Sequence, residues 1–391
     1  MKRTRKIILG LLLFVHCALC ALAGETNSMS VPVLVAGQNA TVLKNEKLFR
    51  GIGVNYFDCF LRNLQNPPDT SYAAGFAILA SNGIPFARFC AGGQWPKDMR
   101  LYQTNRAEYF RQLDTVVNAA ARHGVGLIPS FFWNYSCVPD LVGEPMDQWG
   151  KVQSKTRAWM REYVREVVTR YRDNSVIWAW EFGNEFSLQA CLPNAAEHRP
   201  HVDPTLGIAT SRTSRDDLTF EMIDAAFADF AKVVRTYDSQ RLIFTGDSFP
   251  RNSAWHQQHE NNWTKDSTEQ YGEMLVSANP DPISGISLHA YEVEDEQRLT
   301  QAMAISRKLN KPVFVGEFGV PGDTIAAKLN FYKLLKSIED NEISLAALWV
   351  FDFGTQPNYN VTTETGRSWQ LEAIAEANKK LQNAAAKSKH R

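Results

Sequence analysis

The amino-acid sequence predicts an α/β protein, a (β/α)8 barrel of the TIM-barrel type that is preceded by a short β-hairpin. Three observations support this prediction. Eight short apolar segments recur along the chain, each is followed by an amphipathic segment with helical spacing, and polar residues gather at the ends of the apolar segments. With 391 residues, of which 44% are hydrophobic and 21% charged, the chain can form one large core.

The eight apolar segments are short, nearly unbroken and rich in β-branched and aromatic residues, which is typical of strands buried on both faces of a parallel sheet. They are residues 50–57, 85–90, 125–133, 176–185, 242–247, 283–291, 312–319 and 343–353. The helical segments that follow them are residues 71–82, 106–123, 154–172, 215–237, 267–278, 294–309, 324–340 and 369–382. Regular alternation predicts a parallel sheet with helices outside it, and eight units predict a barrel.

The alternative arrangement is an open, doubly wound sheet. That fold binds dinucleotides at a Gly-x-Gly-x-x-Gly turn after its first strand. No such motif follows residues 50–57. The barrel is therefore the favoured architecture, and the sequence gives no reason to expect a nucleotide cofactor.

The two ends of the chain are predicted to lie outside the barrel. Residues 1–23 combine four basic residues, an apolar run and the small-x-small sequence Ala21-Leu22-Ala23, which together indicate a signal peptide rather than a membrane anchor. We therefore expect a secreted protein, extracellular or periplasmic, with no membrane contact once the signal is removed. Residues 31–49 resemble a hairpin at the start of a single domain spanning 31–383, and residues 384–391 resemble a disordered tail.

Charge and histidine spacing exclude several classes of function. The 42 basic and 42 acidic residues cancel, and no basic stripe is present, so nucleic acid is a poor partner. His256 with His259, and His198 with His201, have loose metal-like spacing but lack an evident third ligand. We expect no metal, no cofactor and a monomeric protein.

Polar residues stand at the carboxyl end of every predicted strand. In a (β/α)8 barrel these ends meet on the face that carries active sites. Long connections after the third, fourth and fifth strands, residues 134–153, 186–214 and 249–266, lie on the same face. The polar and aromatic residues expected there are Asn55, Tyr56, Arg88, Trp133, Asn134, Asn184, Glu185, Asp247, His289, Tyr291, Glu317, Trp349 and Asp352.

Two of these residues, Glu185 and Glu317, are isolated glutamates on different strands. A pair of carboxyl groups flanked by aromatic side chains can cleave a glycosidic bond, with one group protonating the leaving oxygen and the other attacking the sugar or activating water. Glu181 lies inside its strand, so we expect it to be a buried structural carboxylate. Asp247 and Asp352 could contact substrate or cap loops.

Four stretches of the chain resemble the strand motifs of glycoside hydrolase family 5. These stretches are residues 176–185, His-Ala-Tyr at 289–291, residues 313–319, and Leu348-Trp349. The resemblance covers residues 50–382. Asn-Glu on the fourth strand together with Gly-Glu-Phe-Gly on the seventh is the specific part of it.

The resemblance implies roles for individual residues. Glu185 matches the general acid/base and Glu317 the nucleophile of a retaining enzyme. Asn184 matches the residue that holds the 2-hydroxyl of the cleaved sugar. Arg88 matches the arginine that contacts the nucleophile and keeps it ionised. Burial is expected to raise the pKa of Glu185.

The remaining matches concern the sugar-binding surface. His289 and Tyr291 match the pair on the sixth strand, with Tyr291 against the nucleophile. Trp349 matches the platform under the sugar being cleaved. Trp133, followed by Asn134, is similar to the Asn-Asn-Trp stretch of the family's β-mannanases. These matches imply a carbohydrate substrate, a β-glycan.

The chain also departs from the family pattern at two places. Many members carry a histidine at the end of the third strand, where residues 130–134 have none, and a proline after the Asn-Glu pair, where Phe186 stands. The arginine that often follows in mannanases is missing at Ser187 and Leu188. Taken as a whole, the resemblance still implies a retaining enzyme like mannan endo-β-1,4-mannosidase. The alternatives are a β-1,4-glucanase or exo-β-glycosidase of the same family, or a non-catalytic carbohydrate-binding barrel.

Four cysteines follow the predicted signal. Export makes disulfides possible. In the barrel arrangement, Cys59 follows the first strand and Cys90 ends the second, which is its neighbour. Cys137 and Cys191 follow the third and fourth strands, which are also neighbours. We therefore predict the pairs Cys59–Cys90 and Cys137–Cys191.

Overall fold

The computed structural model describes residues 34–292 and 295–387. The predicted signal peptide at 1–23 lies outside the described residues, as do residues 388–391 of the predicted tail. Within the described ranges, no helix combines the length and the hydropathy that are needed to cross a membrane.

Eight parallel strands form a nearly closed barrel, as predicted. In order along the hydrogen-bonded sheet they are β8 (Leu242–Phe244), β7 (Ala179–Gly183), β6 (Gly126–Phe132), β5 (Phe86–Cys90), β4 (Gly51–Asn55), β11 (Leu345–Leu348), β10 (Val313–Phe318) and β9 (Ile286–Ala290). The strands at the two ends of this order, β8 and β9, do not pair directly. Instead, the Ser284 amide donates to the Ile243 carbonyl, and the Gly246 amide donates to Ser287 Oγ.

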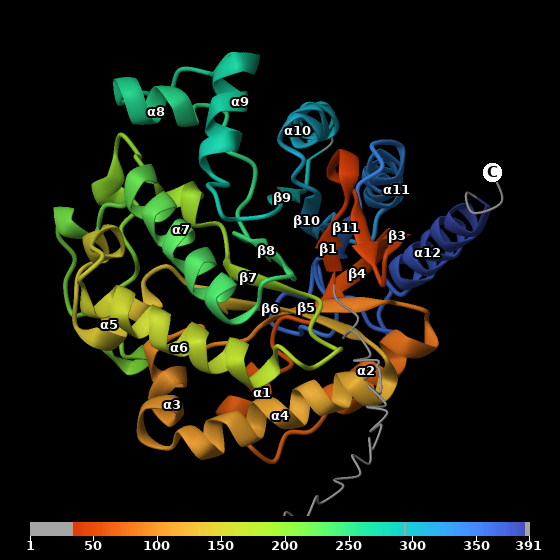
Figure 1. Cartoon of the computed structure of the whole chain (residues 1–391), viewed down its shortest axis with the longest axis horizontal. Helices are drawn as coiled ribbons and strands as arrows, with labels where there is room; N and C mark the ends of the chain where they lie inside the picture. Colours follow the sequence, from red (N-terminus) through yellow and green to blue (C-terminus); the bar gives the residue numbers. More distant parts are fainter. Residues whose placement is uncertain (1–33, 293–294, 388–391) are drawn as a thin grey trace, which may run out of the picture. The chain divides into compact units, whose positions relative to one another are not determined.

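Helices lie around the strands (Figure 1). They are α1 (Leu61–Gln65), α2 (Tyr72–Ser81), α3 (Arg100–Thr104), α4 (Arg106–His123), α5 (Cys137–Val142), α6 (Lys155–Tyr171), α7 (Phe220–Tyr237), α8 (Ala254–Glu260), α9 (Thr268–Ser277), α10 (Asp295–Leu309), α11 (Ile325–Asp340) and α12 (Trp369–Lys387). Each of the eight predicted helices is present. Helix α12 continues to Lys387, into the first residues of the segment expected to be a disordered tail.

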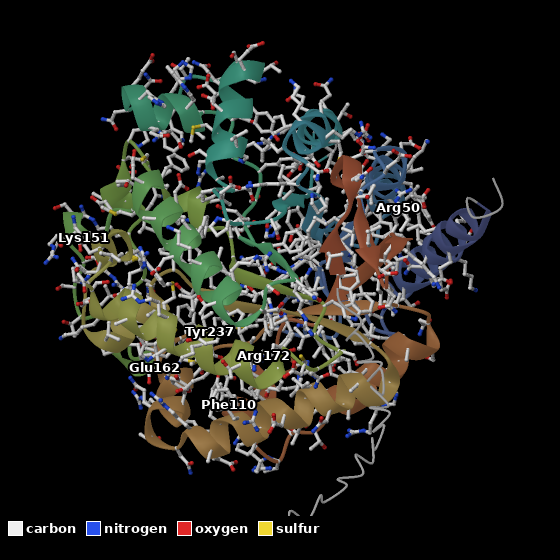
Figure 2. The ribbon with its side chains drawn as sticks, viewed as in Figure 1. Arg50, Phe110, Lys151, Glu162, Arg172 and Tyr237 are labelled. Atoms are coloured by element: carbon white, nitrogen blue, oxygen red, sulfur yellow. The ribbon has the colours of Figure 1, made fainter. Side chains whose placement is uncertain are left out.

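Local capping explains where α7 begins. The prediction placed its start at residue 215, but the helix starts at Phe220, where the Thr219 side chain accepts a hydrogen bond from the Met222 amide. At their other ends, α6 and α7 lie side by side: Arg172, just after α6, donates to the Tyr237 carbonyl (Figure 2).

The segment before the barrel differs from the predicted hairpin. It forms three antiparallel strands, β1 (Leu34–Ala36), β2 (Val42–Lys44) and β3 (Lys47–Phe49), because a second tight turn at residues 45–46 adds a second hairpin. Leu34 and Val42 pack in one cluster with apolar residues from the amino ends of the barrel strands, among them Phe86 and Phe314. The small sheet therefore closes the end of the barrel opposite the predicted active site.

The predicted disulfides are wrong in this structure, because all four cysteines are free thiols. The Cys90 thiol donates to the Gly92 carbonyl instead of pairing with Cys59. Cys137 is buried near Asp98 and Cys90, whereas Cys191 lies near Glu221 and Asp224. Cys59 and Cys90 lie near each other without forming a bond, whereas Cys137 and Cys191, in the connections after β6 and β7, have different neighbours.

The last helix is joined to the first barrel strand by one buried side chain. Asn378 of α12 accepts a hydrogen bond from the Ile52 amide and donates one to the Ile52 carbonyl, both at 2.8 Å. Strand β4 pairs with β5 only at Val54 and Asn55, so Ile52, near the start of β4, has no partner strand on that edge. Asn378 thus takes the place of a neighbouring strand.

We expect Asn378→Ala to lower the free energy of unfolding by about 2–4 kcal/mol, since each buried polar group left unpaired costs about 1–3 kcal/mol. Urea denaturation followed by circular dichroism measures the change. Lys379→Ala, on the exposed face of the same helix, is the control and should change stability by less than about 0.5 kcal/mol. Equal stabilities of the two variants would contradict the role given to Asn378.

Candidate active site

The guanidinium of Arg88 lies at the centre of the residues that converge on the carboxyl end of the barrel. Arg88, on β5, is fully buried. Its five N–H groups all donate hydrogen bonds, to acceptors on or beside β4, β7 and β10. The acceptors are Glu181 at 2.6 Å, Asn55 at 3.0 Å, Glu317 at 2.8 Å, the Gly183 carbonyl at 3.3 Å and Asn184 at 2.9 Å.

Glu317, on β10, is held through both oxygens. Oε1 accepts from Arg88, and Oε2 accepts from the Tyr291 hydroxyl at 2.5 Å. The Tyr291 pKa is raised well above 10, chiefly by burial and further by the charge of Glu317, so this hydroxyl stays protonated and donates. The carboxylate is therefore fixed in orientation, and its side chain is only 5% exposed.

Glu185 follows β7 in a left-handed backbone conformation, with φ of 52°. Few residues other than glycine adopt this conformation. Its amide donates to the Gly246 carbonyl, and its Oε1 lies 2.8 Å from Nδ1 of His289. Its side chain is 32% exposed, in contrast to Glu317. Glu185 is thus the carboxyl group that faces the opening of the site.

His289 links the two glutamates. Its Nδ1 lies 2.8 Å from Glu185 and 3.6 Å from Glu317. The ring leaves no space for a side chain at residue 316, since a Cβ on Gly316 would lie 3.0 Å from His289 Nε2. The glycine of the Gly-Glu-Phe-Gly motif therefore admits the histidine beside the nucleophile candidate.

His289 and Glu185 shift each other's pKa. Burial opposes a charged His289, but the charges of Glu317 and Glu185 outweigh it and raise the His289 pKa above 6.5. For Glu185, burial raises the pKa, but the hydrogen bond and the charge of His289 outweigh it, so its pKa lies below 4.5. The prediction that burial raises the Glu185 pKa is therefore wrong for the unliganded protein, because it left out the hydrogen bond to His289.

One oxygen of Glu185, one oxygen of Glu317 and a ring nitrogen of His289 all lie within 4.8 Å of one another. Carboxyl groups about 5–5.5 Å apart suit direct attack on the sugar, whereas about 6.5–9.5 Å leaves room for a water. The approach of the two carboxyl groups is closer to the first of these ranges than to the second. The same three residues could ligate a metal, but Arg88 already donates to Glu317, so a cation would meet an adjacent positive charge.

The other carboxylates near the site make hydrogen bonds within the protein. Glu181 is fully buried against Arg88, and burial raises its pKa. Asp247 accepts from the amides of Ser187 and Ser248, and burial raises its pKa to about 6. Asp352 accepts from Arg62 and Tyr56. All three hold strands or loops through protein contacts.

Aromatic side chains form one wall of the site. Trp133 and Trp349 stack with ring centroids 5.9 Å apart, and Phe57 packs edge-on against Trp133 at 4.6 Å. Trp133 also lies over the Arg88 guanidinium, 4.4 Å from its ring centroid. The Trp349 indole donates to Gln356, a residue of the loop after β11. Trp133 and Trp349 are both largely buried, at 9% and 8% exposure.

A pocket of about 320 Å³ opens beside Glu185 and Asn184. Its wall includes Trp133 and Asn134 after β6, together with residues from the connection after β5 and from the long connection after β7, which the sequence predicted to lie on this face without indicating which of its residues reach the site. These residues are Gln94, Trp95, Leu188, Gln189, Pro200, His201 and Ile208.

Sequence reasoning also left two site residues without a role. Asn55 bridges Arg88 and the Gly316 carbonyl. Arg251, after β8, donates twice to the Leu188 carbonyl and contributes positive charge near Glu185. The position of Asn55 at a strand end was a usable signal, whereas Arg251 lies in a connection with no recognisable pattern.

Comparison with known proteins places these observations in a family. Residues 63–354 match the model of Cellulase (glycosyl hydrolase family 5). The mannan endo-1,4-beta-mannosidase F of Aspergillus fumigatus is 32% identical over 171 residues, 38% of this chain and 39% of that protein. The enzyme of the same name from Aspergillus clavatus is 32% identical over 91 residues, 22% of this chain and 21% of that protein. The chain thus matches well under half the length of each of these curated relatives.

Solved structures share the fold over most of the chain. The endo-1,4-beta-mannanase of Rhizomucor miehei aligns with a TM-score of 0.63 at 17% identity, covering 91% of this chain and 99% of that one. The exo-beta-1,4-mannosidase Op5Man5 from Opitutaceae bacterium strain TAV5 aligns with a TM-score of 0.59 at 15% identity, covering 88% and 63%. At such identities the likeness concerns the fold alone.

The His289–Glu185 pair predicts how stability depends on pH. A raised His289 pKa stabilises the folded protein fully below pH 6.5, and this contribution is lost as the pH rises through the folded-state pKa. A lowered Glu185 pKa stabilises it above pH 4.5, and this contribution is lost as the pH falls through the folded-state pKa. The stabilisation is therefore greatest between pH 4.5 and 6.5.

We expect His289→Gln to lose most stability, relative to the unaltered protein, in that window, and the difference between the two proteins to shrink as the pH rises through the raised pKa of His289. Urea denaturation across the pH range measures it. His123→Gln, at the exposed end of α4, is the control and should follow the unaltered protein. If the stability difference between His289→Gln and the unaltered protein stays constant with pH, the charge interaction between His289 and Glu185 is absent.

Proposed function

The chain belongs to glycosyl hydrolase family 5, and we propose that it is a retaining β-glycoside hydrolase with Glu317 as nucleophile and Glu185 as acid/base. The observation that carries the proposal is the close approach of the two carboxyl groups, with oxygens within 4.8 Å, around a buried arginine. That spacing suits double displacement. The family match over residues 63–354 supports the same reaction class.

In the first step, a carboxylate oxygen of Glu317 attacks the anomeric carbon while the bond from that carbon to the glycosidic oxygen breaks. Glu185 gives its proton to the departing oxygen. In the second step, Glu185 removes a proton from water, the water oxygen bonds to the anomeric carbon, and Glu317 leaves as a carboxylate. Arg88 and Tyr291 donate to the two oxygens of Glu317 and hold it in line for attack.

The first step needs a proton on Glu185, and in our proposal this proton comes from His289. The raised pKa of His289 and the lowered pKa of Glu185 place a shared proton on the imidazole in the free protein, 2.8 Å from the carboxylate. A bound sugar excludes water from Glu185, and desolvation favours the neutral carboxyl group. The proton then moves from His289 to Glu185 as substrate binds.

We propose a β-1,4-linked mannan or its oligosaccharides as substrate, with β-1,4-glucan as the second candidate. Stacked Trp133 and Trp349 offer apolar surface for sugar rings, and the balanced charge of the chain suits a neutral polymer. Relatives that are named mannan endo-1,4-beta-mannosidases favour mannan over glucan. The signal-like residues 1–23 favour secretion, consistent with a polymer outside the cell.

Removal of either glutamate separates their roles. We expect Glu317→Ala to lower kcat by about 10³-fold or more on mannan, cellulose and aryl β-glycosides alike. Glu185→Ala should lose far less activity on aryl β-glycosides with good leaving groups than on mannan, since such groups depart without a proton. Glu372→Ala, exposed on α12, is the control. Full activity of Glu317→Ala on all substrates would remove Glu317 as the nucleophile.

The stereochemistry of the product tests the double displacement independently of any variant. Two successive displacements at the anomeric carbon leave the first-formed sugar with the β configuration of the substrate. Proton NMR of the earliest product, recorded before mutarotation, reads that configuration. An α product would mean a single displacement by water, and the assignment of Glu317 would then be wrong.

A further inference from the structure

Two connections on the active-site face meet one another beside the pocket that Glu185 lines. One follows β5 and includes Pro96 and Lys97, and the other is the long insertion after β7. Gly207 of the insertion packs directly on the first connection, since a Cβ added to it would lie 3.1 Å from Pro96 Cβ. Lys97 also lies within electrostatic reach of Asp203. We name this contact between residues 94–97 and residues 200–208 the loop bridge.

Ion pairs hold the insertion on both sides of the bridge. Arg199 makes two hydrogen bonds to Asp217, at 2.6 and 2.9 Å. Arg212 makes two to Asp140 of α5, both at 2.7 Å, and both side chains are at most 5% exposed. Such paired bonds from arginine fix direction as well as distance. Residues 200–208 are therefore held in place rather than left as a free loop.

The pocket beside Glu185 lies under this bridge. Residues of both connections line it, Trp95 from one and His201 and Ile208 from the other. Glu185 and Asn184 line it as well, whereas Glu317 is not among its lining residues. A sugar in this pocket would touch the proton donor and not the nucleophile, which is the position of the leaving group.

The pocket is also small. At about 320 Å³ it is near the lower end of the range for ligand pockets, about 300–1,000 Å³. Because Trp95 and His201 bring both connections of the loop bridge to the wall of this pocket, a longer chain bound in it would meet the bridge.

We propose that the loop bridge closes the leaving-group end of the site, so that the enzyme removes one or two sugars from the reducing end of a chain and does not cut internal bonds. This inference rests on the proposed function, since it takes Glu185 as the proton donor. The substrates would then be chain ends and short oligosaccharides. The sequence resemblance, in contrast, implies an enzyme that cuts internal bonds.

The position of the cleaved bond tests the proposal on the unaltered protein. Manno-oligosaccharides of three to six sugars, with oxygen-18 at the reducing-end anomeric carbon, are hydrolysed briefly, and the labelled products are sized by mass spectrometry. We expect labelled products of one or two sugars, whatever the substrate length. Labelled products of three or more sugars would overturn the inference and leave the proposed function standing. Absence of hydrolysis here and on aryl β-mannosides would overturn both.

A variant without the bridge gives the converse result. Residues 200–208 are replaced by Gly and Ser at the same length, with Arg199 and Arg212 retained. We expect labelled products of three or more sugars to appear, and hydrolysis of polymeric mannan to rise several-fold relative to hydrolysis of the short oligosaccharides. An unchanged product pattern in the folded variant would overturn the inference. If the variant does not fold, the pattern of the unaltered protein still decides.

The control for that variant is Val202→Ser. Val202 lies in the same segment, is 39% exposed and does not line the pocket. We expect it to keep the product pattern of the unaltered protein. A broadened pattern in this variant would mean that general loosening of the insertion, rather than loss of the bridge, changes the cleavage position.

Discussion

The hydrogen-bonding demand of one buried cation, Arg88, organises the active-site face. A guanidinium without solvent contact must find acceptors for five N–H groups, and a buried charge left unpaired is strongly destabilising. The acceptors come from β4, from β7 and the residue after it, and from β10. The barrel strands bring these acceptors around the guanidinium, and it in turn fixes the position of Glu317. Stability of the barrel mouth and orientation of the nucleophile candidate thus depend on the same set of hydrogen bonds.

Three glutamates of similar sequence context acquire different environments around this cation. Glu181 is fully buried and serves the structure, and Glu317 is nearly buried and held at both oxygens. Glu185 faces the opening and lies 2.8 Å from Nδ1 of His289. Placement relative to Arg88 and His289, rather than residue type, therefore separates the structural carboxylate from the candidates for nucleophile and acid.

The connections after the strands add what the barrel itself does not supply. The strands bring together Arg88, Glu317 and His289, which concern the bond to be cleaved. The contact of Gly207 with Pro96 and the ion pair of Arg212 with Asp140 position the connections that, in our proposal, limit the substrate beyond that bond. Separating these two tasks lets substrate choice change in the connections while the reacting groups stay fixed on the barrel, as the architecture permits.

The sequence alone determined the barrel, its eight units and the positions of Arg88, Glu185, Glu317 and His289. It did so because these features depend on local periodicity and on strand ends, which parallel strands bring to one face by construction. It did not determine the thiol states, the third N-terminal strand or the lowered pKa of Glu185. Nor did it place the wall that residues 200–208 form with the connection after β5. These depend on contacts between segments far apart in the chain, and no local pattern encodes which loops meet or which carboxylate a histidine reaches.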